Sequence, residues 1–480
     1  MSSSSDNLLA QRMAERMQRI RQRQQNNSSS QVELPALIDD RENRFSPFPL
    51  ADLQQAYWLG RSSHIDGGNV GIHGYFELER ENLDIDRFIA AWRALIERHD
   101  MLRVYVTENG EQQVLEKIPD FDLPLVDLRG ISKEEQVQSV LELRNQMAHR
   151  VFDLSVWPQF DLRFVRMTDT VTHIHMCIDG WCMDGWSYQI MFRELGLLYE
   201  TPDLSLPNPP FLFRDYVLAL KNFEATPRYE RDLMYWKERI ANLPSAPLLP
   251  VCLNEEKDRN AMPTFTRYED SLSTDEWISF RNFARENQLT VANCLLALFS
   301  ETLAFWSQSQ QLTINVPNFN RFPIHPGISE VVGQFASFTL HVADCSQKKS
   351  FLEQVQQTQQ SMWTDLQYNA VSGMRVLREA AKQSGSGGTQ LFPVVFTTAP
   401  GQIVDGQRAT AALSLSSIGK TLFYRTHTPQ VWLDCQYVEY EDQIEYFWDV
   451  IDGKYPEGMI NDMFATFSSA LKRLATDSHS

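Results

Sequence analysis

Apolar positions recur with helical spacing in the first half of the chain. Between residues 84 and 99 they lie three and four positions apart, which predicts an amphipathic helix with one buried face. This stripe consists of Ile85, Phe88, Ile89, Trp92, Leu95 and Ile96. Ser132 and Glu135 have the spacing of a capping box, so a second helix is expected to begin there and to run to about Arg150.

A period of two replaces the helical period between residues 160 and 178. Phe160, Leu162 and Phe164 alternate with polar residues, which is typical of a half-buried strand. A turn at 168–170 leads into a second strand-like run at 171–178. The two runs are therefore expected to form a β-hairpin.

The second half of the chain continues in the same style. It predicts helices at 276–286, 290–306 and 350–366, and strands near 312–317, 392–398, 430–440 and 443–450. Helices mixed with hairpins favour an α+β fold with mixed sheets over a regular βαβ series. The proline-rich stretch 202–210 is the best candidate for a boundary, which predicts an N-terminal lobe over 45–210 and a C-terminal lobe over 211–480.

Residues 1–44 differ in composition from the rest of the chain. Leu9, Met13, Met17 and Ile20 have helical spacing among several arginines, and a Gln/Asn/Ser tract follows at 22–31. A short amphipathic helix followed by a linker is expected. It is either a docking helix for another polypeptide or a frayed leader, and the second interpretation is slightly favoured.

Composition excludes several classes of partner. The 480 residues hold 44 Lys and Arg against 62 Asp and Glu, a formal charge of −18, which argues against binding to nucleic acid or to an anionic membrane. Six cysteines without a CxxC pair indicate a reduced, cytoplasmic chain. The longest apolar run, 289–306, contains polar residues and suits a buried helix better than a membrane span.

Common cofactor motifs are missing from the sequence. It has no GxGxxG, no Walker A loop and no GxSxG, so neither dinucleotide nor ATP binding is supported. His173, His175 and Cys177 share one face of the expected strand and could bind a metal. Residues two apart on a strand share a face by default, so mixed packing is the favoured interpretation and no metal is expected.

Two aspartates follow the predicted hairpin directly. Asp179 and Asp184 stand five positions apart in a turn rich in Gly and Trp, and Ser187 comes three residues later. The apolar surroundings imply partial burial, where a carboxylate needs a partner or has a raised pKa.

This pattern resembles the DxxxxD motif, followed by Ser, of heterocyclization (Cy) domains of nonribosomal peptide synthetases. Cy domains are a variant of the condensation domain, which carries HHxxxDG at the same place. Further segments resemble the family's motifs in order along residues 45–470: 48–61, 98–103, 243–250, 290–306, 392–398, 428–434 and 448–459. Two positions depart from the family pattern, because Gln334 replaces a usual Asp and Thr398 a usual Ser.

The resemblance implies a fold, a reaction and partners. The fold would be a V-shaped pseudo-dimer of two chloramphenicol-acetyltransferase-like lobes with a central tunnel. Donor and acceptor peptidyl carrier proteins, together with an adenylation domain, would be the partners, as in siderophore or antibiotic biosynthesis. Substrates would arrive on the 4'-phosphopantetheine arms of the carriers, and the domain would need no cofactor of its own.

The implied reaction has two steps. An upstream acyl or peptidyl thioester is joined to carrier-bound Cys, Ser or Thr, and the product is then cyclodehydrated to a thiazoline or oxazoline. The second step needs general acid–base groups near the amide carbonyl. By resemblance, Asp434 and Thr397 match the family's cyclodehydration pair. The alternative is a strand Asp in a hairpin and a Thr with β propensity.

Other polar residues have open roles. Gln430 shares the expected strand face of Asp434, and Asn320 and Ser187 are further active-site candidates. Asp184 is expected to form a structural buried ion pair with Arg321, because Arg is suited to bidentate carboxylate pairing. Asp179 is retained as a catalytic candidate with an open role.

Two rival functions remain at this point. A condensation domain that forms only an amide is disfavoured by the missing HH before the aspartate-rich turn. A non-catalytic scaffold that docks carrier proteins is disfavoured by the presence of Thr397 and Asp434.

Overall fold

The computed structural model describes residues 33–61, 71–252, 264–384, 392–398, 402–404, 407–409, 415–427 and 430–477. The helix expected near the N-terminus, with residues 1–32, lies outside the described residues. From Glu33 the chain runs through a short 3-10 helix, Arg41–Asn43, and the helix α2, Asp52–Gly60.

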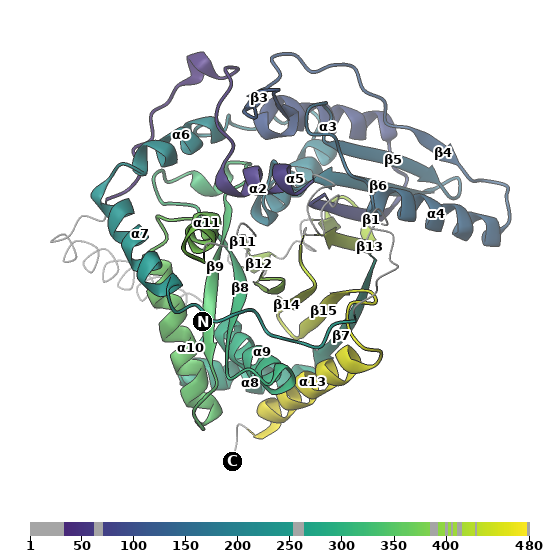
Figure 1. The fold of residues 1–480 in the computed structure, drawn as a ribbon. Helices are drawn as coiled ribbons and strands as arrows, with labels where there is room; N and C mark the ends of the chain where they lie inside the picture. The colour runs from purple at the N-terminus through teal and green to yellow at the C-terminus, as the bar shows by residue number, and fades with distance from the viewer. Residues whose placement is uncertain are drawn as a thin grey trace, which may run out of the picture.

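The first lobe is built on a five-stranded sheet in the order β13-β1-β6-β5-β4 (Figure 1). Its strands are β1 His73–Glu81, β4 Leu125–Asp127, β5 Phe160–Arg166, β6 Val171–Asp179 and β13 Lys420–His427. The expected hairpin is confirmed, because β5 and β6 pair antiparallel with Phe160 opposite Ile178.

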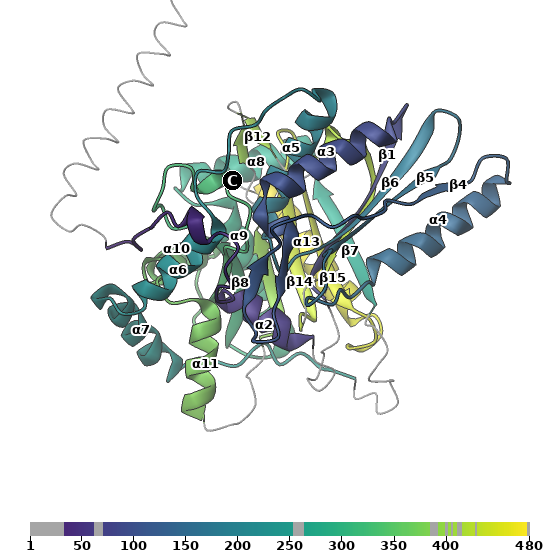
Figure 2. The same ribbon diagram turned by 90° about the horizontal axis from the view of Figure 1, so that it is seen from above.

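Helices cover both faces of this sheet, and the alternation of side chains decides which helix meets which face. The helices α3 (Ile85–Arg98) and α5 (Gly185–Glu200) pack with Phe76, Ile174 and Met176 in the main apolar core. The helix α4 (Lys133–Ala148) lies on the opposite face, where Met147 meets Tyr75 (Figure 2). The capping box of Ser132 and Glu135 opens α4 as expected.

The second lobe is built on a six-stranded mixed sheet in the order β7-β15-β14-β10-β8-β9. Its strands are β7 Phe265–Leu272, β8 Gln311–Phe319, β9 Ala336–Asp344, β10 Val394–Thr398, β14 Leu433–Glu439 and β15 Ile444–Ile451. The strand β10 runs parallel to both β8 and β14, whereas the other neighbours are antiparallel. The expected mixed sheet is therefore confirmed.

Four helices pack on the second sheet: α8 Thr274–Glu286, α9 Val291–Ser307, α10 Phe351–Gln367 and α13 Met459–Asp477 (Figure 1). Aromatic rings fill the space between this layer and the sheet. The rings of Phe299 in α9, Phe467 in α13 and Trp448 in β15 meet in a buried aromatic cluster. The apolar run at 289–306 is thus a core helix.

The remaining elements connect and flank the two lobes. They are β2 Val104–Val106, β3 Gln112–Val114, α6 Phe213–Phe223, α7 Pro227–Ile240, α11 Gly373–Ser384, β11 Gln402–Val404, β12 Gln407–Ala409 and the 3-10 helices Asp100–Arg103 and Ile328–Glu330. Within the described ranges, each helix alone is too short or too polar to cross a membrane. Only the sharply bent pair α8 and α9 passes a test of length and composition.

The α+β fold with two lobes is confirmed, and segments beyond residue 210 pack on the first lobe. The strand β13, from the C-terminal half of the chain, pairs antiparallel with β1 at the edge of the first sheet. Phe213 and Tyr216 of α6 belong to the apolar core of the first lobe. The boundary near residue 210 stays a prediction, and these segments show that the chain crosses between lobes after it.

The approach of β13 to β1 predicts the effect of one substitution. A Cβ at Gly419, directly before β13, would lie 2.7 Å from the backbone oxygen of Glu79. Because a backbone atom cannot move aside cheaply, Gly419→Ala should lower the free energy of unfolding by about 1–3 kcal/mol. Chemical denaturation measures the change. Gly60→Ala is the matched control, because its Cβ would meet nothing within 4 Å; equal losses in both variants would contradict the prediction.

Candidate active site

Asp179 ends β6 and is buried against Arg61, the residue that follows the helix α2. Arg61 donates from one nitrogen to both carboxylate oxygens of Asp179 at 2.7 Å, and the backbone N–H of Trp181 donates to Oδ1 at 2.9 Å. Burial raises the pKa of Asp179, and the Arg61 guanidinium opposes that rise. The sequence interpretation missed Arg61, although it is the last residue of the motif at 48–61.

Asp184 caps the N-terminus of α5 and pairs with Arg321 as expected. Its Oδ1 accepts hydrogen bonds from the backbone N–H of Ser187 at 2.8 Å and from Arg321 at 2.9 Å. Arg321 also donates to the backbone oxygens of Ile328 and Val331, and its guanidinium lies 4.0 Å from the ring centre of Phe335. The ion pair joins the first lobe to the segment that follows β8.

Ser187 is fully buried inside this arrangement. Its hydroxyl lies 2.7 Å from Asp184 and 2.9 Å from the backbone oxygen of Gly333, and it accepts from the Gly333 N–H at 3.0 Å. Arg321 donates to the same oxygen at 3.0 Å. A hydroxyl surrounded in this way favours a structural role for Ser187 over the catalytic role expected from sequence.

Gln334 ties the turn between the two aspartates to the second half of the chain. Its side-chain amide donates to the backbone oxygens of Gly180 at 2.7 Å and Met183 at 3.1 Å, and its oxygen accepts from the Ala336 N–H. A carboxylate could not donate these two hydrogen bonds. The departure from the family pattern at this position thus has a physical role in this chain.

Thr397 and Asp434 lie side by side on neighbouring parallel strands. The Thr397 hydroxyl donates to Oδ1 of Asp434 at 2.8 Å, and the Gln436 amide donates to Oδ2 at 2.9 Å. Thr397 follows the buried run of β10, and Asp434 belongs to β14. In the parallel register Val395 stands opposite Asp434 and Thr397 opposite Gln436, so the pairing makes Thr397 and Asp434 diagonal neighbours. Both residues keep some contact with solvent.

A second aspartate and its arginine complete this cluster. Asp449 stands opposite Asp434 in the antiparallel pair of β14 and β15, and the Gln436 amide also reaches it at 3.3 Å. Arg267 of β7 donates to both oxygens of Asp449, at 2.8 and 2.7 Å. Arg267, Gln436 and Asp449 were all missed, although Asp449 lies in the motif at 448–459.

The two aspartates have unequal surroundings, and this difference sets the chemistry of the site. Burial raises the pKa of Asp434 to about 8, and the nearby Asp449 carboxylate adds to the rise. The hydrogen bonds from Thr397 and Gln436 and the charge of Arg267 act in the opposite direction but are weaker than desolvation. Asp434 therefore holds its proton at neutral pH and can exchange it near neutrality.

The other expected residues lie in different settings. Gln430 precedes β14 in a left-handed backbone conformation with φ of 63°. Asn320 and Asn369 exchange amide hydrogen bonds of 3.3 Å beside a small cavity that Ser337 and Tyr368 also line. The structure brings Thr397 to Asp434 and Ser187 to Asp184 and Arg321, whereas Asp179 pairs with Arg61.

Comparisons with known proteins add to this geometry. The family model for the condensation domain matches residues 47–480. Phenyloxazoline synthase MbtB from Mycolicibacterium paratuberculosis is 32% identical over 447 residues, which cover 91% of this chain and 36% of that protein. Bacitracin synthase 1 from Bacillus licheniformis is 32% identical over 435 residues, 90% of this chain and 8% of that protein.

Solved structures also include one that is similar to this chain over nearly its whole length. The crystal structure of the EpoB NRPS cyclization-docking bidomain from Sorangium cellulosum has a TM-score of 0.83 and 33% sequence identity, covering 98% of this chain and 92% of that one. The chain spans less than two-fifths of the length of MbtB and less than a tenth of bacitracin synthase 1.

The buried pair of Asp179 and Arg61 yields a stability prediction. Arg61→Ala leaves a carboxylate buried without its counter-charge, so the free energy of unfolding should fall by about 3–5 kcal/mol. The double variant Arg61→Ala/Asp179→Asn should recover part of this loss, because it removes the stranded charge. Urea unfolding measures both. Arg129→Ala, which breaks an exposed pair with Asp127, is the control and should change little; an equally small loss for Arg61→Ala would contradict the prediction.

Proposed function

Since this chain is a heterocyclization domain of the condensation-domain family, we propose that it catalyses both amide formation and cyclodehydration. An acyl or peptidyl group on one carrier protein is joined to Cys, Ser or Thr on a second carrier, and the product becomes a thiazoline or oxazoline. The observation that carries this proposal is the 2.8 Å hydrogen bond between Thr397 and Asp434.

The first step needs little chemistry from the protein. The amine nitrogen attacks the donor thioester carbon, a C–N bond forms, the C–S bond breaks, and the amine proton ends on the departing thiol. A thioester is already activated, so positioning of the two substrates supplies most of the acceleration. Neither step requires a nucleotide.

The second step is the one for which Asp434 is suited. The side-chain thiol or hydroxyl adds to the new amide carbon, and its proton passes to the carbonyl oxygen, which becomes a hydroxyl. This hydroxyl takes up one further proton and leaves as water, while the amide nitrogen gives up its own proton and the C=N bond forms. Hydroxide is a poor leaving group, so a proton must reach that oxygen. Asp434 carries a proton at neutral pH because burial raises its pKa to about 8.

Thr397 and Gln436 orient the Asp434 carboxyl for this transfer. Each donates one hydrogen bond to a different carboxyl oxygen, which restrains the rotation of the side chain. Arg267 binds Asp449, so the neighbouring carboxylate has its own counter-charge. Asp179, Asp184 and Ser187 are assigned structural roles in this proposal, because each is buried and bound to arginine or backbone groups.

The proposed partners follow from the relatives, which are synthases much longer than this chain. Donor and acceptor peptidyl carrier proteins would present the substrates on 4'-phosphopantetheine arms, and an adenylation domain would load the acceptor. Docking through the N-terminal segment stays a prediction.

Asp434→Asn should separate the two steps. Asparagine keeps the shape but cannot donate an acidic proton, so the cyclization rate should fall about 10²–10⁴-fold while amide formation continues. Two loaded carrier proteins are mixed with the domain, and product mass distinguishes the amide from the ring by one water. Asp442→Asn, in the exposed turn after β14, is the control and should cyclize normally.

Cyclization at the normal rate by Asp434→Asn would refute the role of Asp434. An amide as the only product of the unaltered domain would indicate a simple condensation domain.

The raised pKa also predicts a pH dependence. If Asp434 donates the proton, the single-turnover rate of cyclization should fall as pH rises through about 8, because the group loses its proton there. The Thr397 hydrogen bond stabilises the carboxylate and lowers the pKa of Asp434. Thr397→Val should therefore move this fall to higher pH. Comparing the two profiles on one substrate cancels the titration of the substrate itself; a midpoint that stays in place or moves to lower pH would count against the assignment.

A further inference from the structure

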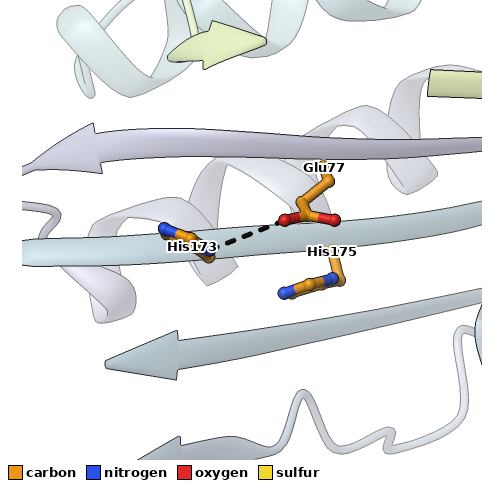
Figure 3. Close-up of side chains that lie close together, drawn as sticks. All are labelled: Glu77, His173 and His175. Atoms are coloured by element: carbon orange, nitrogen blue, oxygen red, sulfur yellow. Dashed lines mark ion pairs between the residues drawn. The ribbon is translucent and has the colours of Figure 1, made fainter. Parts of the chain in front are cut away.

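Two neighbouring strands of the first sheet carry a buried carboxylate and two imidazoles on one face. Glu77 of β1 stands directly opposite His175 of β6, and His173 lies two residues before His175 on the same face (Figure 3). Helix α4 covers this face and places Arg144 against Glu77. The cluster belongs to neither the aspartate-rich turn nor the Asp434 site.

The potential ligand atoms of the three side chains converge. One atom from each of Glu77, His173 and His175 lies within 4.8 Å of the others. His173 Nδ1 and Glu77 Oε1 are 3.7 Å apart, too far for a hydrogen bond. This separation is close to the distance of about 3.3 Å between two ligands that each lie about 2.0–2.1 Å from a tetrahedral zinc ion.

Two ring nitrogens of this cluster make no hydrogen bond in the described part of the chain. His173 Nδ1 and His175 Nε2 are both buried without a hydrogen bond. The His175 side chain has no exposed surface, so solvent does not satisfy Nε2. A buried polar atom left unsatisfied is destabilising, and buried polar groups in proteins are almost always bonded. A bound cation would use both lone pairs.

Tyr75 is placed to hold His175 in the tautomer that can bind a metal ion. Tyr75 Oη lies 2.7 Å from His175 Nδ1 and 3.4 Å from Glu77 Oε2. If Nδ1 donates to Tyr75, the lone pair of Nε2 is left for a ligand, as in metal-bound histidines with a second partner.

We propose that Glu77 Oε1, His173 Nδ1 and His175 Nε2 form a binding site for a divalent transition-metal ion such as Zn²⁺, which clips β1 to β6. The sequence interpretation named Cys177 as the third candidate ligand, and it favoured packing because residues two apart on a strand share a face by default. Cys177 is not in the cluster, and the carboxylate comes from the neighbouring strand instead. Arg144, which donates to Glu77 Oε2 at 2.8 Å, supplies the counter-charge when no metal is bound and opposes its entry.

Zinc binding to the whole chain tests the proposal. The protein is stripped with chelator in a Cys252→Ser background, because the exposed Cys252 thiol is an adventitious zinc ligand. Titration with Zn²⁺ should show one saturable equivalent and a raised melting temperature, and Co²⁺ should give a visible absorption band of a nitrogen- and oxygen-bound ion. His173→Gln and His175→Gln should each abolish the equivalent. His325→Gln, in the segment after β8, is the control and should keep it.

Failure is readily recognised. Absence of saturable binding, or retention of the same equivalent in both His173→Gln and His175→Gln, overturns the proposal. If His175→Gln does not fold, His173→Gln decides, because this ring is partly exposed and better tolerates replacement. These measurements do not depend on peptide synthesis, so their outcome is separate from that of the catalytic assays.

Two neighbouring residues provide a sharper test. Tyr75→Phe removes the partner of His175 Nδ1, and the Kd for Zn²⁺ should rise about 10–100-fold. Arg144→Gln removes the competing cation, so it should lower the melting temperature of the metal-free protein, and added Zn²⁺ should bind more tightly and restore it. Weaker zinc binding by Arg144→Gln, or unchanged binding by Tyr75→Phe, would contradict this assignment of ligand atoms.

Discussion

The buried contact of Asp184 and Ser187 with Arg321 is the constraint on which the arrangement of the two halves depends. Asp184 and Ser187 come from the turn and helix after β6, whereas Arg321 follows β8 in the other half of the chain. Gly333 and Gln334 add backbone and amide hydrogen bonds to the same turn. A charge buried in this way is stable only with its partner in place, so the relative position of these segments is strongly restrained.

This constraint separates two kinds of aspartate in one protein. Asp179 and Asp184 each have an arginine and backbone donors, and they serve to hold the chain together. Asp434 has only neutral donors, while the arginine beside it binds Asp449. A pair of carboxyl groups in unequal surroundings is the arrangement by which proteins obtain one acid and one anion at the same pH. In our proposal the two aspartates of the DxxxxD motif are thus structural, and the proton donor lies elsewhere.

The same reasoning applies to the face of the first sheet under α4. Its polar side chains lie in a layer that is otherwise packed with Tyr75, Met147 and Cys177. Glu77 has Arg144 and Tyr75 as partners, but His173 Nδ1 and His175 Nε2 make no hydrogen bond in the described part of the chain. The unequal hydrogen bonding of these three side chains is therefore the basis for the proposed metal site, just as unequal surroundings are the basis for the role proposed for Asp434.

The sequence by itself determined the local elements and the family. Periodicity located α3 and the β5–β6 hairpin, because the spacing of apolar side chains must match the geometry of the element that buries them, and a capping box located α4. Motif order indicated the two-lobed fold, and the charge of Asp184 required a partner, for which Arg321 was named although 137 residues separate the two. Other partners far apart in sequence were not predicted. Arg61 with Asp179, Arg267 with Asp449, and Glu77 with His175 meet only because strands and helices from distant segments are packed together. A pKa and a set of ligand atoms depend on distances between such groups, and those distances exist only in the folded chain.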